Sequence, residues 1–230
     1  MLRATAIAAS ALACVAVATP AAQAQTPREL LTAAAFQAPN KAAALALVQQ
    51  AIAASERTLS AHPGDHEATL QRGVGIGYRA KLTRSRTDAR TSLAIFEGLA
   101  AHDPRDAEAQ MVIAGWHLDA IEQLGSLVAR AGLGARGDAG EAALNRGVAL
   151  GGNRAFYLGL AAMMKIRRDP GAVGQARRWA EAALTATTPT PLDMRMKRAA
   201  EAILPALRAN NGKAAAALAR KLLPFGRMAV

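Results

Sequence analysis

The sequence has few of the residues on which β-sheets and disulfide-linked folds depend. Aromatic residues make up 3% of the 230 residues and there is one cysteine, whereas alanine alone supplies 60. Strands need β-branched and aromatic side chains to cover a pleated surface, and no window of the sequence alternates apolar and polar residues over a sustained length. The composition therefore excludes an ordinary β-sandwich or barrel and predicts an all-α fold in a single domain.

Long hydrophobic runs are absent beyond the N-terminus. Hydrophobic residues reach 52%, largely because of alanine, but charged residues interrupt every apolar run well before the length of a membrane span. At the N-terminus, Arg3 precedes an uncharged stretch over residues 4–18, and Ala22-Gln23-Ala24 has the small-x-small pattern that signal peptidase accepts. This pattern predicts a cleavable signal peptide over residues 1–24 and a periplasmic or secreted chain with no transmembrane span after its removal.

The single cysteine, Cys14, lies inside the predicted signal peptide. Lipoprotein signals usually carry leucine three residues before the acylated cysteine, whereas Leu12 stands two residues before Cys14. A lipoprotein anchored through Cys14 is therefore the lesser alternative. Removal of residues 1–24 would leave no cysteine, which excludes a structural disulfide, a thiol nucleophile and cysteine-based metal sites.

Acidic residues are scarce relative to basic ones. The chain has 28 Lys and Arg residues against 17 Asp and Glu residues, which gives a net charge of +11. Such basicity would indicate nucleic acid in a cytosolic protein, but the predicted export argues against that partner. Basic residues concentrate in the predicted helices over 192–223, which form either a solvated face or a surface for anionic lipid or envelope polymer. The candidate residues for an anionic ligand are Arg195, Arg198, Arg208, Arg220 and Lys221.

Capping signals and helical spacing of apolar residues predict about nine or ten helices. Thr26-Pro27 before Glu29, and Thr190-Pro191 before Asp193, each combine a cap, a first-turn proline and an acid placed to close a capping box. The most regular helix is expected over 107–128. The other expected helices cover residues 27–35, 41–61, 66–82, 88–101, 138–150, 154–168, 170–186, 192–209 and 213–223.

Two segments of the sequence recur further along the chain at a similar spacing. Residues 59–68 (LSAHPGDHEA) return as residues 99–109 (LAAHDPRDAEA), and the tetrapeptide EAAL at 141–144 returns at 181–184. This period fits stacked helical hairpins, because one alanine-rich hairpin cannot bury its apolar face alone.

The repeats resemble the tetratricopeptide repeat family, loosely, over about residues 40–190. Gly73 and Ala114 match the small residue of the first helix in a unit, and Phe96 matches the large residue of a second helix. Pro63 and Pro104 match the proline that closes a unit. The spacing of the units is longer than the family's repeat of about 34 residues, and the usual aromatic residue early in the first helix is missing.

The resemblance implies a right-handed stack of antiparallel helical hairpins, a TPR-like α-solenoid, as a single domain over residues 25–230. In that family the first helices of the units line a concave surface that binds a protein or peptide. Transferred to this sequence, the partner-binding residues would be Tyr78, Met111, His117, Asp119 and Tyr157.

No group of residues carries a convincing catalytic or metal-binding pattern. The glycines in residues 73–77 lack the strand and the spacing of a nucleotide loop, so close helix packing explains them better. His62 and His66 flank a Pro-Gly turn and do not share a helical face as metal ligands would. Asp119 and Glu122 could form a carboxylate pair on one helix face, but a polar groove edge is the simpler interpretation. We therefore expect no catalytic residue, cofactor or metal.

The sequence alone thus favours a non-catalytic periplasmic scaffold or adaptor that binds a protein or peptide partner in the envelope. The alternative is a carrier or adaptor for anionic lipid or envelope polymer that uses the basic C-terminal helices. The two hypotheses differ in their dependence on salt, because binding by the basic helices should weaken steeply with ionic strength.

Overall fold

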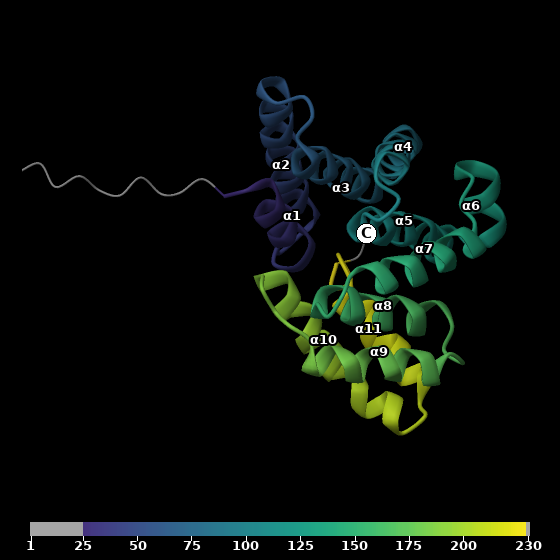
Figure 1. Cartoon of the computed structure of the whole chain (residues 1–230). Coiled ribbons are helices and arrows are strands. Elements are labelled where there is room, and N and C mark those ends of the chain that lie inside the picture. The colour runs from purple at the N-terminus through teal and green to yellow at the C-terminus, as the bar shows by residue number, and fades with distance from the viewer. Residues whose placement is uncertain (1–24, 229–230) are drawn as a thin grey trace, which may run out of the picture.

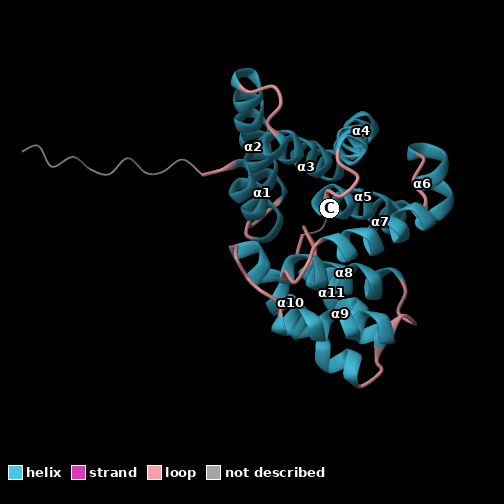
Figure 2. Ribbon diagram, in the orientation of Figure 1, coloured by secondary structure: helices cyan, strands magenta, loops and turns pink. Residues whose placement is uncertain are grey.

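The computed structural model describes residues 25–228, which fold entirely into helices and connecting loops (Figures 1 and 2). The all-α prediction is confirmed, and within the described range no residues form a strand. The predicted signal peptide, with Cys14, lies outside these residues. The helices are α1 (Pro27–Phe36), α2 (Lys41–Ala61), α3 (His66–Thr83), α4 (Arg86–His102), α5 (Ala107–Leu124), α6 (Ser126–Leu133), α7 (Gly137–Leu150), α8 (Ala155–Arg168), α9 (Val173–Thr185), α10 (Pro191–Arg208) and α11 (Gly212–Leu222).

The expected helix over 107–128 is two helices, so the described residues contain eleven helices rather than nine or ten. α5 ends at Leu124, and Gly125 adopts φ +76°, a left-handed value that favours glycine and stops the helix. The apolar spacing continues across this break, which is why periodicity alone predicted one helix. The second piece, α6, projects from the body of the molecule (Figure 1) and leaves Leu127 86% exposed.

The predicted capping boxes at the first and tenth helices are present. The Thr26 side chain accepts a hydrogen bond from the Glu29 backbone, and the Glu29 carboxylate accepts one from Thr26. Thr190 and Asp193 make the same reciprocal pair at the start of α10. Each box satisfies backbone N–H groups that the helix itself leaves without partners.

The internal sequence repeat is also a repeat of local structure. The turns after α2 and α4 cover His62–Asp65 and Asp103–Asp106. In each turn the first residue ends the preceding helix, and the backbone N–H of the fourth residue donates a hydrogen bond to the carbonyl of the first residue at 3.0 Å. The fourth residue, Asp65 or Asp106, then caps the next helix with its side chain. The turn over Asp169–Ala172 has the same 3.0 Å hydrogen bond.

Small residues let paired helices approach closely. Gly73 of α3 faces Phe96 of α4, where a Cβ would lie 2.7 Å from the ring, and Gly75 faces Ile52 of α2 at the same distance. Gly159 of α8 lies against the backbone of Met196 in α10. The glycines of residues 73–77 therefore serve close packing inside α3, as the sequence analysis predicted, and not a nucleotide loop.

The apolar core has two main parts. One part joins α5 and α7 through α11, with Met163, Ile166 and Ile203 fully buried. The other part joins α1, α2 and α3, and it also contains Phe225, which follows α11. The segment after the last helix therefore crosses to the N-terminal helices, and this crossing creates the pocket described next.

Candidate functional site

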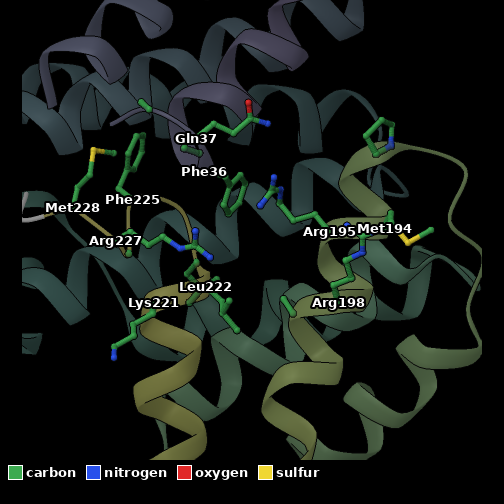
Figure 3. A pocket seen from close by; sticks show the side chains of 16 residues that line it. Phe36, Gln37, Met194, Arg195, Arg198, Lys221, Leu222, Phe225, Arg227 and Met228 are labelled. Atoms are coloured by element: carbon green, nitrogen blue, oxygen red, sulfur yellow. The ribbon is translucent and has the colours of Figure 1, made fainter. Parts of the chain in front are cut away.

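A pocket of about 570 Å³ lies where three distant parts of the chain meet (Figure 3). The end of α1 and the following turn form one wall, α10 forms the second, and the end of α11 with the segment after it forms the third. The lining residues are Ala35, Phe36, Gln37, Ala38, Pro191, Met194, Arg195, Arg198, Ala199, Lys221, Leu222, Leu223, Phe225, Gly226, Arg227 and Met228. We call this site the tail pocket and residues 223–228 the tail.

The tail pocket combines an apolar lining with four basic side chains. Phe36, Leu222 and Met228 are half-buried and contribute apolar surface, together with Phe225. The basic side chains are Arg195 and Arg198 from α10, Lys221 from α11 and Arg227 from the tail. Figure 3 shows that Arg195 and Arg227 extend into the pocket from opposite walls. Lys221 points away from its middle and so belongs to the rim.

Among residues 25–228, the charges in the tail pocket have no counter-charge of their own. None of the sixteen lining residues is acidic, and none of its four basic side chains forms an ion pair within residues 25–228. Several cations on one concave surface add their potentials and concentrate anions there. The pocket is therefore electrostatically suited to a negatively charged ligand.

Arg195 is the most constrained of the four cations. Its guanidinium lies over the Phe36 ring, 4.8 Å from the ring centroid, which is a favourable cation–π distance. Burial, followed by the charges of Arg227 and Arg198, lowers the pKa of Arg195 below its ordinary value. A half-buried cation that faces two like charges would gain most from an anion placed between them.

The tail wall of the pocket is held by Phe225. This side chain is 2% exposed, and its backbone N–H donates to the Ala35 carbonyl of α1 at 2.9 Å. Its ring makes an edge contact with Tyr78 of α3, with centroids 4.8 Å apart. The Lys81 ammonium lies 5.8 Å from the same ring centroid and donates to the Pro224 carbonyl at 3.4 Å. These contacts fix the tail onto the N-terminal helices.

The structure divides the five residues predicted for an anionic ligand. Arg195, Arg198 and Lys221 line the tail pocket. Arg208 instead pairs with Glu181 at 3.3 Å, and Arg220 pairs with Glu122 at 2.8 Å, both outside the pocket.

Sequence reasoning missed two functional features of the pocket. Arg227 belongs to the basic segment but was not nominated, because it follows the last helix and no periodicity places it. Phe36 ends a short helix, and nothing in its local sequence indicates that an arginine from the tenth helix would lie on its ring.

The residues predicted to line a concave groove are mostly inside the core. Met111 is 1% exposed, and His117 and Tyr157 are each 6% exposed, so the expectation that they present an open surface is corrected. Tyr78 is half-buried against Phe225. α5 packs against α7 and α8, and the tail packs against α3.

His117 occupies a structural position. Its Nδ1 accepts a hydrogen bond from the Arg136 backbone N–H at 3.3 Å. Burial and the nearby Arg136 charge lower the pKa of His117 below its ordinary value, which keeps the ring neutral. The Nδ1 atom is thus engaged by the backbone at the start of α7.

Asp119 lies at the centre of a compact charge cluster and not in a carboxylate pair. Lys81 of α3 and Arg167 of α8 each approach the carboxylate at 2.8 Å, whereas Glu122 pairs with Arg220. Burial acts to raise the pKa of Asp119, but Lys81 and Arg167 outweigh it, so the pKa lies below its ordinary value. We call Lys81, Asp119 and Arg167 the Asp119 cluster.

The two histidines considered as metal ligands do not form a metal site. His66 Nε2 lies 2.7 Å from an Asp106 carboxylate oxygen, across the repeated turns. Over the described part of the chain no three His, Cys, Asp or Glu side chains gather in a way that could hold a metal ion.

Comparison of the chain with protein-family models, with curated proteins and with solved structures finds no match. Between residues 25 and 228, no helix combines the length and the hydropathy that crossing a bilayer requires.

Proposed function

We propose that this protein is a non-catalytic binding protein whose tail pocket holds an anionic amphiphile. One observation carries the proposal: four basic side chains and an apolar lining share a pocket whose described walls contain no carboxylate. An anionic head group would supply the missing counter-charge, and an apolar chain would cover the half-buried side chains of Phe36, Leu222 and Met228. This is the carrier hypothesis of the sequence analysis, narrowed from a basic surface to one pocket.

The proposal includes an architecture and a location. We propose that five hairpins, α1/α2, α3/α4, α5/α7, α8/α9 and α10/α11, stack as a degenerate TPR-like solenoid, with α6 as an insertion. The contacts between successive helices support this order. The N-terminal sequence pattern supports export to the periplasm, where amphiphilic ligands of the envelope are available.

Binding of two amphiphiles with the same chain tests the proposed function. Octyl phosphate should bind in isothermal titration calorimetry, whereas octyl glucoside, with a neutral head, should bind at least about tenfold more weakly. The double variant R195M/R227M should lose about tenfold or more in affinity for octyl phosphate. It removes the two charges that extend into the pocket and keeps unbranched apolar side chains.

The matched control is R208A/R220A, which removes the same charge outside the pocket. Its affinity should stay within about twofold of the natural chain, apart from a small effect of net charge. Equal binding of both amphiphiles, or equal losses in the two double variants, would contradict a specific anion site.

A second candidate function is supported by α6. Leu127 and Val128 of α6 are 86% and 55% exposed, and Leu124 at the end of α5 is 45% exposed. Contiguous exposed apolar surface often marks a protein interface. We propose that a protein or peptide partner contacts this patch. Cross-linking in intact cells should capture a partner with the natural chain and lose it with L127K, because a lysine cannot be buried there without cost.

A further inference from the structure

The number of uncompensated charges in the tail pocket points to the charge of the ligand's head group. We propose that the pocket takes a single amphiphile whose head is a phosphate monoester, bound as the dianion. This inference rests on the proposed function and specifies its ligand.

The first step concerns charge. Arg195 and Arg227 extend toward each other from opposite walls, with Arg198 one turn along α10 from Arg195. A monoanion between Arg195 and Arg227 would compensate only one of these two opposed charges, whereas a dianion compensates both. A phosphate monoester carries about −1.5 to −2 charges at pH 7 and offers three acceptor oxygens, so it can satisfy donors that approach from two sides.

The second step concerns donor geometry. Three of the four cations are arginines, and a guanidinium presents a planar fork of N–H donors that matches phosphate oxygens in pairs. The Arg195 guanidinium lies over the Phe36 ring, 4.8 Å from its centroid, and forms no ion pair with a described carboxylate. No lining residue is acidic, so no carboxylate oxygen of the pocket walls competes for these donors.

The third step concerns the rest of the ligand. The tail closes one side of the pocket, with Phe225 buried beneath it, and Leu222 and Met228 half-buried. A long polymer needs an extended track of cations, whereas Arg195 and Arg227 extend into one pocket of about 570 Å³. That volume lies within the usual range for small-molecule sites, which favours one amphiphile molecule over a polymer or a bilayer surface.

The proposed dianion makes a specific prediction about pH. A phosphate monoester loses its second charge near pH 6, whereas an alkyl sulfate carries one charge throughout. The charged groups that line the pocket are Arg195 and Arg198 on α10, Arg227 on the tail and, at the rim, Lys221 on α11, and α1 contributes none. The lining residues that the structure describes include no histidine and no carboxylate, so we expect a change in affinity between pH 7.5 and 5 to come from the ligand.

Calorimetric titration of the full chain with octyl phosphate and octyl sulfate tests the inference. At pH 7.5, octyl phosphate should bind about tenfold more tightly than octyl sulfate, and at pH 5 the difference should shrink to about threefold or less. Inorganic phosphate should bind at least about tenfold more weakly than octyl phosphate, because it makes no apolar contacts.

The outcomes separate the inference from the proposed function. Equal affinity for octyl phosphate and octyl sulfate at pH 7.5, with both lost in R195M/R227M, would overturn the dianion and leave the anionic pocket intact. No binding of either, in a chain with normal circular dichroism, would overturn both. Inorganic phosphate as tight as octyl phosphate would overturn the apolar part of the ligand.

A vesicle experiment identifies the source of the phosphate. The protein should bind monomeric octyl phosphate below its micellar concentration. Sedimentation with phosphatidylcholine vesicles that contain phosphatidic acid, without any binding of the monomer, would place the interaction at a bilayer surface and overturn the enclosed site. The control R208A/R220A should follow the natural chain in every arm.

Discussion

The Asp119 cluster and the tail pocket use the same kinds of cations in opposite ways. In the cluster, Lys81 and Arg167 share one carboxylate supplied by the chain, at 2.8 Å each. In the pocket, Arg195 and Arg227 approach each other with no such carboxylate among the described residues. In the Asp119 cluster, the chain itself supplies the carboxylate that pairs with the cations. In the tail pocket, we infer that a ligand supplies the anion.

Phe225 lies between the two regions, and its removal should have the largest effect. F225A would leave a cavity in the part of the core that contains Leu31, Val48 and Tyr78, and it should lower the free energy of unfolding by about 4 kcal/mol. Because Phe225 also positions the tail, the F225A substitution should lower the affinity for octyl phosphate as well. Urea unfolding measures the first effect and calorimetry the second. A stable variant with unchanged affinity would show that the tail does not shape the pocket.

The Asp119 cluster should respond next most strongly. D119N keeps the shape of the side chain but leaves Lys81 and Arg167 without a counter-charge, and Arg167 is only 8% exposed in its side chain. We expect a loss of about 3 kcal/mol in urea unfolding. Ligand affinity should fall less than in F225A, since the pocket residues are untouched and only the Lys81 contact with the tail is affected. A loss below about 0.5 kcal/mol, as is usual for exposed ion pairs, would make the cluster an ordinary surface feature.

Acid should weaken the Asp119 cluster and leave the pocket charges unchanged. The pKa of Asp119 is lower in the folded chain than its ordinary value, so the unfolded state binds more protons as the pH falls below about 4. The stability from this carboxylate is present above that pH and is lost as the pH falls through the folded pKa. Between pH 5 and pH 3, the free energy of unfolding should therefore fall more steeply for the natural chain than for D119N.

The smallest effect on stability is expected inside the pocket. R195M keeps an apolar contact with Phe36 and removes the repulsion from Arg198 and Arg227. Its unfolding free energy should lie within about 0.5 kcal/mol of the natural chain, and any change should be a gain. A loss of about 2 kcal/mol or more, beyond the range of ordinary surface substitutions, would mean that Arg195 has a structural partner. The pocket cations would then be compensated within the fold, like those of the Asp119 cluster.

The helices and their order were accessible from the sequence because their signals are local. Caps such as Thr26 and Asp65, and the recurring turns at Pro63 and Pro104, are determined by residues within a few positions of one another. The helix end at Gly125 was not predicted, because the apolar spacing continues without interruption on both sides of it. A residue type that permits a left-handed φ does not by itself require one.

The candidate site was only partly predictable, because charge compensation is a tertiary property. Arg208 and Arg220 look like Arg195 and Arg198 in the sequence, yet they pair with Glu181 and Glu122, the latter 98 positions earlier in the chain. Only the folded chain separates compensated arginines from uncompensated ones. The position of the tail could not be predicted either, because its sequence has no helical period and its contacts are with α1 and α3, which are distant in the chain.

The seating of Phe225 against Ala35 has a consequence for the order of folding. Nearly the whole described chain separates these two residues. The apolar residues of α1, α2 and α3 that contact Phe225 therefore stay uncovered until the tail has been synthesised. Contacts of such sequence separation slow folding and prolong the exposure of apolar surface. The early helices should therefore depend on chaperones until the tail arrives, and tail variants should aggregate sooner than variants altered in α9.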